Sequence, residues 1–171
     1  MSEPLEETVW SGNYIVAKRR GRWEYVGRAR SIGAAVILAV QDDHVLLVEQ
    51  WRVPLQRRCL ELPAGLVGDE TVDEDVVVSA ARELEEETGW RAERIEIIGE
   101  FASSPGMVSE TFTLVTAHGL TKVGDGGGVP GENIAVHRVR LDGIAAFVAA
   151  KRAEGVAIDT KLLLLLAGSI L

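Results

Sequence analysis

Residues 68–90 form an acidic stretch that holds the side chains best suited to chemistry. The stretch contains nine of the chain's 26 acidic residues and a single basic residue, Arg82, so its net charge is −8. The formal charge of the whole 171-residue chain is also −8, so the remaining residues balance one another. Carboxylates concentrated in this way form either a solvated acidic face or a site for hard cations.

The apolar spacing of this stretch predicts a helix over residues 72–88. Thr71 and Glu74 fit a capping box at its start, and Gly89 fits a C-terminal stop. On a helical wheel three glutamates share one flank, and Glu85 points away from them. These three are Glu83, Glu86 and Glu87, and the adjoining apolar flank that packs inward holds Val77, Ala80, Ala81 and Leu84.

Like charges at this spacing repel by a few tenths of a kcal/mol per pair on an exposed helix. The repulsion is larger beside an apolar flank, and a divalent cation would remove it. Mg²⁺ binds oxygen ligands, usually one or two carboxylates together with substrate phosphates and water. A solvated acidic face is the alternative interpretation.

The stretch resembles the Nudix box: Gly, five residues, Glu, seven residues, then Arg-Glu-bulky aliphatic-x-Glu-Glu-x-Gly-bulky aliphatic. Only Trp90 departs from the pattern, because it is bulky and apolar without being aliphatic. The matching residues are Gly68, Glu74, Arg82, Glu83, Leu84, Glu86, Glu87 and Gly89. The resemblance implies a hydrolase acting on a nucleoside diphosphate linked to another group, or a Nudix-like domain that has lost this activity.

The resemblance also implies a set of metal ligands. Glu83 and Glu87 would bind Mg²⁺, with Mn²⁺ as a substitute, and the Ala64 carbonyl would supply a third oxygen. Glu86 would bind a further metal or a water molecule. Arg82 would orient the acidic face by pairing with Glu86 at i+4.

Two features outside the box resemble ADP-ribose pyrophosphatases. The Glu-Leu-Pro-Ala-Gly run at residues 61–65 looks like a turn of that subfamily. Pro105 lies 16 residues after Gly89, where the subfamily carries a marker proline, and Glu110 follows it. The expected reaction is hydrolysis of ADP-ribose to AMP and ribose 5-phosphate. Other nucleoside diphosphate sugars, such as GDP-mannose, and a nucleotide-sensing domain without hydrolysis are the alternatives.

The general base is expected on a later loop. Residues 119–133 contain six glycines and one proline, so we expect a mobile loop without regular structure. Subfamily members carry the water-activating carboxylate on such a loop, which makes Glu132 the candidate here. The candidate catalytic residues are therefore Glu132, Glu86 and Arg82; a solvated loop glutamate is the alternative for Glu132.

Substrate contacts are expected from residues elsewhere in the chain. Arg52 follows a predicted strand and is a candidate for a phosphate contact, and Glu110 is a candidate for a ribose hydroxyl. Pro105 and Arg28 complete this set, and Arg28 lies in a basic segment, residues 18–30, that could attract a phosphorylated ligand. Surface ion pairs are the alternative for these charged residues.

The predicted architecture is α+β, which the resemblance sharpens to an α/β/α sandwich with a mixed sheet. Residues 1–31 form an N-terminal β-hairpin arm, and residues 32–171 form the Nudix domain. The arm has a loose acidic tail at residues 1–9 and two strands, at 14–18 and 23–28. Further predicted strands span residues 32–40, 44–51, 60–62, 95–101, 111–117 and 134–141. Asp142 is expected to cap one helix, and Asp159 or Thr160 the last one.

Composition narrows the expected partners and compartment. A pI near 4.9 argues against nucleic acid as a partner. Cys59 is the single cysteine, so no intrachain disulfide can form, and its apolar neighbours predict a buried thiol. The N-terminus does not resemble a signal peptide, and the apolar run at residues 162–171 is too short to cross a bilayer. We therefore expect a cytoplasmic protein, and the aromatic residues of the arm, with the resemblance, predict a homodimer.

Overall fold

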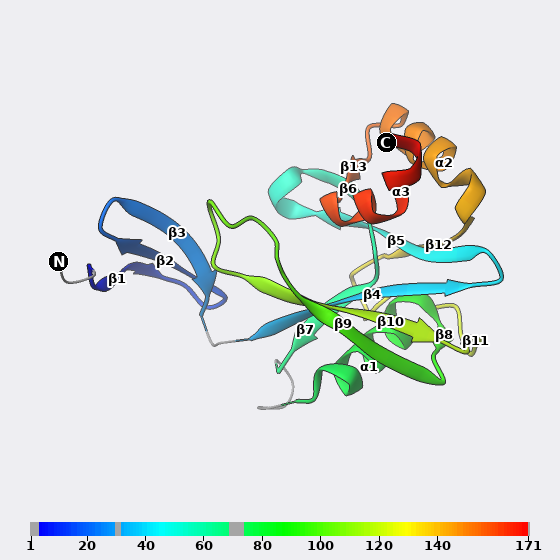
Figure 1. The fold of residues 1–171 in the computed structure, drawn as a ribbon, viewed down its shortest axis with the longest axis horizontal. Coiled ribbons are helices and arrows are strands. Elements are labelled where there is room, and N and C mark those ends of the chain that lie inside the picture. Colours follow the sequence, from blue (N-terminus) through cyan, green and yellow to red (C-terminus); the bar gives the residue numbers. More distant parts are fainter. Residues whose placement is uncertain (1–3, 30–31, 69–73, 171) are drawn as a thin grey trace.

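The computed structural model describes residues 4–29, 32–68 and 74–170. It contains a mixed eight-stranded sheet flanked by helices and a separate three-stranded sheet at the N-terminus (Figure 1). The main path of the large sheet runs β13-β6-β5-β4-β10-β9, with β12 paired to β5 and β7 paired to β4. This arrangement confirms the α+β class and the predicted mixed sheet.

The strands of the large sheet are β4 (Gly33–Gln41), β5 (His44–Arg52), β6 (Arg57–Glu61), β7 (Ala64–Val67), β9 (Arg94–Ala102), β10 (Thr111–His118), β12 (Ala135–Arg140) and β13 (Ala157–Ile158). A small second sheet pairs β8 (Trp90–Arg91) with β11 (Thr121–Lys122). The helices are α1 (Val76–Thr88), α2 (Ile144–Ala153) and α3 (Leu163–Ile170), with short 3₁₀ turns at Val53–Leu55, Leu141–Gly143 and Thr160–Leu162.

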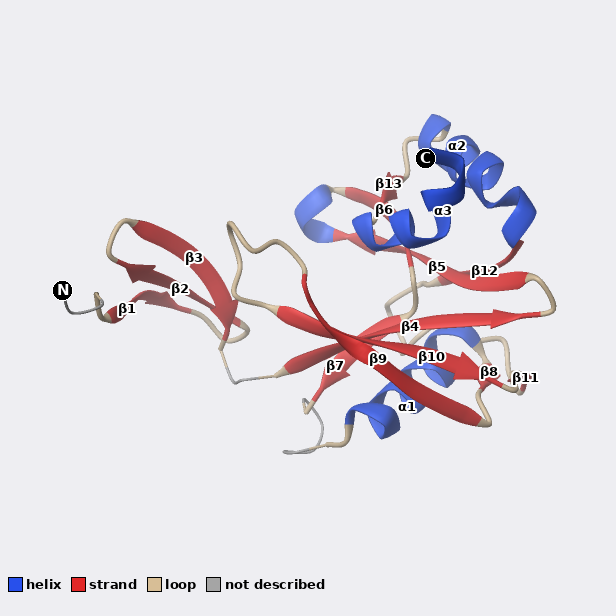
Figure 2. Cartoon of the chain, in the orientation of Figure 1, coloured by secondary structure: helices blue, strands red, loops and turns tan. Residues whose placement is uncertain are grey.

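The large sheet is buried on both faces, which explains the continuous apolar runs of its central strands. On β4, Ala35, Ile37 and Ala39 lie in a core cluster with Ala80 and Leu84 of α1. The intervening Val36 lies in the second cluster, with residues of α2 and α3. Helices therefore cover both faces of the sheet, as Figure 2 shows, and the α/β/α layering is confirmed. Complete burial of Leu84 contributes ~2 kcal/mol to holding α1 in place.

Helix α1 begins later than the sequence predicted. Asp75 is the N-cap, and its carboxylate accepts hydrogen bonds from the backbone N–H groups of Val77 (2.8 Å) and Val78 (3.3 Å). The capping box with Glu74 is therefore wrong, because the next acidic residue already satisfies these donors; Thr71 lies outside the described residues. Gly89 ends the helix with a left-handed φ of 73°, as expected.

Three other local expectations are corrected. Residues 6–11 form a strand where a loose tail was expected, because Glu6 and Glu7 pair with basic residues of the adjacent strand. Residues 64–67 form strand β7, which pairs with β4 in antiparallel fashion, where only a turn was expected. Asp142 does not cap α2, because both its carboxylate oxygens accept from the Arg140 guanidinium. Asp159 does cap the last 3₁₀ turn, accepting from the Lys161 N–H at 2.7 Å.

The N-terminal arm contains β1 (Glu6–Ser11), β2 (Ile15–Arg20) and β3 (Trp23–Arg28) and projects from the main domain (Figure 1). Among the described residues, one isolated β-bridge connects the arm to the main domain, between Val26 and Val108. The Val26 N–H donates to the Met107 carbonyl, and the Val26 carbonyl accepts from the Ser109 N–H. The loop at residues 103–110 thus fixes the base of the arm. None of the described helices is long and apolar enough to cross a membrane.

Candidate active site

A cavity of about 590 Å³ lies where α1 approaches β7 and the ends of β5 and β6. Residues far apart in the sequence meet in its wall. Seven predicted site residues line it, namely Arg28, Arg52, Ala64, Glu83, Glu87, Glu110 and Glu132. Another cavity of similar size, between α2 and α3, has one acidic residue, Asp159, in its wall. The carboxylates therefore single out the first cavity as the candidate active site.

Gly65 allows Glu83 to reach the cavity wall. A Cβ atom on Gly65 would overlap the Glu83 carboxyl group, so the side chain passes directly over the backbone of β7. A glycine is needed here for close approach and not for an unusual backbone angle. The last residue of the Glu-Leu-Pro-Ala-Gly run thus has a steric role beside the acidic helix.

Glu87 is a buried carboxylate, with 6% of its surface exposed. Its Oε2 accepts a hydrogen bond from the Ala64 N–H at 3.0 Å. Burial raises the pKa of Glu87 to about 8; the charges of Glu83 and Glu132 act in the same direction, while the Ala64 N–H and Arg52 oppose them. The site therefore holds an excess of negative charge that a hard cation would stabilise.

The donors present fit a divalent cation that also binds substrate. Among the described residues, no three His, Cys, Asp or Glu side chains are already arranged as a complete metal site. Mg²⁺ commonly takes only one or two carboxylates and fills its remaining positions with water and substrate phosphates. Glu83 and Glu87, in the same wall as Ala64, match that pattern, so the residues fit the metal that the box implies.

Arg82 and Glu86 lie outside the main cavity wall. Arg82 Nη1 is 3.0 Å from Glu83 Oε1 and 3.2 Å from Glu86 Oε2, and Nη2 is 3.7 Å from Glu74 Oε2. The expected i+4 pair with Glu86 is present, and the guanidinium also holds the neighbouring carboxylates. The Glu86 side chain is 39% exposed and lines a neighbouring hollow with Gly89 and Gly124. Glu85, expected to be solvated, pairs with Arg91.

The glycine-rich loop is attached to the end of α1. The Gly127 N–H donates to the Glu87 carbonyl (2.9 Å), and the Gly128 N–H donates to the Glu86 carbonyl (3.0 Å). Residues 121–122 also form strand β11. Only this two-residue strand was not expected: residues 123–133 contain no helix or strand, as predicted, but the free carbonyls at the helix end provide hydrogen-bond partners for the loop backbone.

Glu132 reaches the cavity from this anchored loop. Its Oε2 accepts from the Val129 N–H at 2.9 Å, and its own N–H donates to the Val129 carbonyl. These bonds close a tight turn. Glu132 lies in the same cavity wall as the α1 acids, and its charge contributes to the raised pKa of Glu87.

The predicted substrate-binding residues form ion pairs in the wall. Arg52 makes two 2.7 Å hydrogen bonds to Glu61, a carboxylate that is only 4% exposed. Arg28 Nε lies 2.5 Å from Glu110 Oε1. Pro105 is exposed, lies in the loop that holds the base of the arm and is not in the cavity wall.

Sequence reasoning missed part of the wall, which also includes Gln50, Cys59, Glu61, Phe112, Asp159 and Lys161. Glu61 belongs to the run at residues 61–65 that resembles the subfamily, but no spacing rule places residue 161 in the same wall as residue 83. Cys59 is buried as expected; burial, together with Glu61, raises the pKa of its thiol to about 12.

Known proteins resemble this chain over most of the main domain. A model of the NUDIX domain matches residues 29–157. The chain is 36% identical over 125 residues to the methanol dehydrogenase activator of Bacillus methanolicus, which covers 72% of this chain and 66% of that protein. It is 39% identical over 90 residues to the ADP-ribose pyrophosphatase of Bacillus subtilis (strain 168), an alignment that covers 52% of this chain and 47% of that protein. It is 40% identical over 103 residues to the ADP-sugar pyrophosphatase of Mus musculus, an alignment that covers 55% of this chain and 46% of that protein.

These alignments span about half to two thirds of the length of the relatives. A solved structure described as an ADP compounds hydrolase superimposes with a TM-score of 0.67 at 22% identity, covering 87% of this chain and 84% of that one, which supports the fold. The family model covers well over half of the chain and includes the acidic motif on α1. The chain therefore belongs to the Nudix family of hydrolases.

Proposed function

We propose that this chain hydrolyses the diphosphate bond of ADP-ribose to give AMP and ribose 5-phosphate. One arrangement supports this activity above all. The carboxylates of Glu83, Glu87 and Glu132 lie in the wall of one cavity together with Arg52 and the Arg28–Glu110 pair. The carboxylates suit metal and water, and the arginines and Glu110 suit phosphates and ribose hydroxyls. Similarity to ADP-ribose pyrophosphatases favours this substrate over others.

A divalent cation is part of the proposal, with Mg²⁺ favoured and Mn²⁺ as a substitute. Glu83 and Glu87 would hold it with the Ala64 carbonyl, and Glu86 would hold a further ion or water. When bound, the cation stabilises negative charge on the phosphoryl oxygens. Arg82 keeps the carboxylates in place through its contacts with Glu83, Glu86 and Glu74.

The chain's own residues would then orient the substrate and move one proton. Arg52, held by Glu61, would bind a phosphate, and Glu110 would accept from a ribose hydroxyl. Glu132 would take a proton from the water that attacks phosphorus, while the bridging oxygen leaves with the other phosphate. Arg28 keeps Glu110 oriented, and Pro105 shapes the loop that carries Glu110.

A second substrate class is supported by the similarity to an ADP-sugar pyrophosphatase. The same carboxylates and arginines would act on another nucleoside diphosphate sugar, such as GDP-mannose, since in the proposed arrangement they would contact only the diphosphate and ribose. A nucleotide sensor that binds without cleaving is the remaining alternative. The complete set of acidic motif residues favours hydrolysis over it.

A hydrolysis screen tests the proposal. ADP-ribose, GDP-mannose, UDP-glucose and dinucleoside polyphosphates are each incubated with the protein, Mg²⁺ and a phosphatase that releases phosphate only from monoesters. The highest kcat/KM is expected for ADP-ribose, and no hydrolysis of any substrate is expected in EDTA. A higher value for GDP-mannose would support the second class. Binding of ADP-ribose by calorimetry without phosphate release would contradict hydrolysis and support a sensor.

A further inference from the structure

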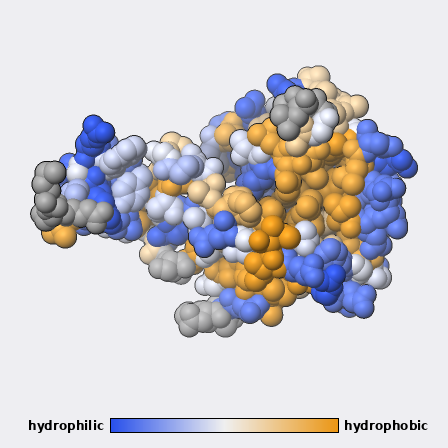
Figure 3. Space-filling view, in the orientation of Figure 1, coloured by the Kyte–Doolittle hydropathy of each residue, from blue (hydrophilic) through white to orange (hydrophobic). Residues whose placement is uncertain are grey.

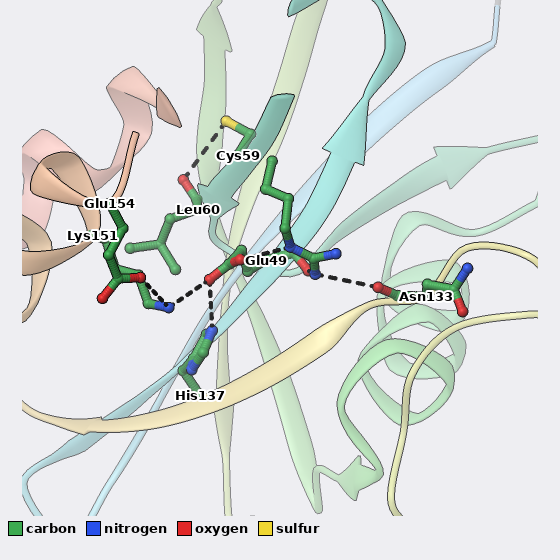
Figure 4. A network of polar contacts seen from close by, with 8 residues as sticks. Glu49, Cys59, Leu60, Asn133, His137, Lys151 and Glu154 are labelled. Carbon is green, nitrogen blue, oxygen red and sulfur yellow. Dashed lines mark hydrogen bonds and ion pairs between the residues drawn. The ribbon is translucent and has the colours of Figure 1, made fainter. Parts of the chain in front are cut away.

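A group of polar and charged residues around one buried carboxylate lies between the large sheet and α2. Its centre is Glu49 on β5, with 6% of its surface exposed. The Glu49 carboxylate contacts Arg58 Nε (2.6 Å), Lys151 Nζ (2.9 Å) and His137 Nε2 (3.1 Å). Figure 4 shows Glu49 between Lys151 of α2 and His137 of β12, with Asn133 on the other side. None of these side chains belongs to the metal or diphosphate contacts proposed above.

The contacts keep Glu49 ionised. Burial alone would raise its pKa, but the hydrogen bonds from Lys151, Arg58 and His137 outweigh burial, and the pKa is lowered. A buried carboxylate with three such partners is held in one position, because moving it would break several charge-assisted hydrogen bonds at once. Glu49 therefore gives Arg58 a rigid support.

Arg58 connects this support to the loop that carries Glu132. Its Nη2 donates to the Glu49 carbonyl at 2.5 Å and to the Asn133 carbonyl at 3.3 Å. Asn133 directly follows Glu132 and has a left-handed backbone, with φ of 51°. The Ile134 N–H then donates to the Gly127 carbonyl at 3.2 Å. The contact from Arg58 thus lies at the point where the chain turns from Glu132 into β12.

We propose that Arg58, held by Glu49, is a positioning residue that fixes the Asn133 peptide and thereby the Glu132 carboxylate over the α1 acids. The role rests on the proposed function of Glu132. It predicts that losing the Arg58 contact affects the catalytic step and not substrate binding. The carboxylate would visit more orientations, and only a fraction would be in place to accept the proton.

Two substitutions separate positioning from stability. Arg58→Lys keeps a positive charge beside Glu49 but cannot reach both Glu49 and Asn133, because lysine has a single donor group at its end. Arg58→Gln removes the charge as well. Arg57→Gln is the matched control, since Arg57 is the adjacent, exposed residue of β6 and lies outside both the Glu49 contacts and the cavity wall of the candidate site.

Kinetics on the substrate identified by the screen give the first readout. Arg58→Lys is expected to lower kcat about tenfold with KM changed less than about twofold, and Arg57→Gln to leave both unchanged. In a Glu132→Gln background, Arg58→Lys should lower the residual kcat by less than about twofold, because it acts through Glu132. An equal loss in both backgrounds would overturn the proposal.

Hydrogen exchange gives a readout that does not depend on activity. In the substrate-free protein, the backbone amides of residue 129 and residues 131–134 should exchange about tenfold faster in both Arg58 variants than in the wild type or Arg57→Gln. Exchange as slow as in the wild type would refute the positioning role even if kcat fell. If the wild type hydrolysed no substrate, the proposed function would fail, while this exchange experiment would still decide what Arg58 does.

Discussion

Glu83 and Glu87 are one helical turn apart, yet their surroundings differ. Glu83 lies across Gly65 and contacts Arg82, whereas Glu87 is buried and accepts from the Ala64 N–H. Burial raises the pKa of Glu87, so this carboxylate resists ionisation in the metal-free protein. The same pair would share one cation, so both should be needed for activity.

Substituting either acid tests this shared role. Glu83→Gln and Glu87→Gln should each lower kcat/KM more than about 30-fold, equivalent to ~2 kcal/mol of transition-state stabilisation. Folding should survive, because each change removes one of several like charges. Steady-state kinetics with and without EDTA, together with a thermal melt, provide the check. Full activity in EDTA or in either variant would refute the metal assignment.

Glu87 should also make stability depend on pH in the metal-free protein. Its pKa rises from an ordinary 4.5 to about 8 in the folded state, so between these values the folded chain keeps a proton that the unfolded chain has released. The free energy of unfolding should therefore fall as pH rises through this window, by at most about 1.4 kcal/mol per pH unit. Urea denaturation in EDTA at several pH values measures the slope, which Glu87→Gln should reduce; equal slopes in the two proteins would contradict the assignment.

Glu132 should contribute mainly to the chemical step. Glu132→Gln keeps a side-chain oxygen for the Val129 N–H but removes the proton acceptor. We expect kcat to fall about 100-fold with little change in KM, as for a general base. A near-normal kcat would show that Glu132 is not the general base, and Glu86 and Glu110 would be tested next.

At the scale of elements, the junction between α1 and the glycine-rich loop joins the proposed metal ligands to the proposed base. The loop backbone donates to the Glu86 and Glu87 carbonyls, so the end of the helix positions Glu132 as well as Glu87. Gly126 has a φ of 69°, and a Cβ there would overlap the backbone of Glu87 and Thr88. Contact this close requires glycine.

A single methyl group should therefore disturb the junction. Gly126→Ala is expected to lower kcat about tenfold or more by moving the loop off α1, while metal affinity stays within about twofold. Alanine at Gly127 and Gly128, which also have left-handed φ values, should slow turnover in the same way. Gly124→Ala is the control, because a Cβ there meets no described atom within 4 Å. Equal kcat values for the Gly126 and Gly124 variants would show that the junction does not position the base.

At the scale of the whole molecule, the N-terminal arm exposes large aromatic side chains on a sheet with little core of its own. Trp10, Tyr14 and Trp23 are 56%, 70% and 59% exposed. Figure 3 shows a further apolar area over the front of the main domain. Exposed apolar residues of β9 and α3 include Ile97, Ile98, Phe101, Leu163 and Leu164. Exposed apolar surface on this scale is typical of protein–protein contacts.

We therefore propose that residues 1–31 form a dimerisation arm for a symmetric homodimer. Light scattering at micromolar concentration should give twice the chain mass of 18.5 kDa. Replacing Trp10 and Trp23 together by serine should raise the dissociation constant more than about tenfold, because both lose apolar contact area. Val123→Ser, in the loop after β11, is the control. A wild-type monomer at this concentration would rule out the arm's proposed role.

Local sequence rules determined the acidic helix and most strands. Helical spacing alone put Glu83, Glu86 and Glu87 on one flank, and Gly89 set the end of the helix, because both properties depend on neighbours within a few residues. Continuous apolar runs identified β4 and β5 for the same reason, since a strand buried on both faces has apolar side chains at successive positions. The resemblance then supplied the chemistry of the motif.

Only the tertiary structure decided which residues meet across the cavity. Lys161 lies in the wall and Arg58 contacts Asn133 because the fold brings together segments far apart in the sequence. Glu61 meets Arg52 across the pairing of β5 with β6, and the sequence pattern did not indicate this contact either. The attachment of the glycine-rich loop to α1 could not be predicted for a related reason. Its composition gives the conformational freedom of the chain but not its hydrogen-bond partners, and those partners are the free carbonyls at the end of α1, more than thirty residues earlier in the sequence.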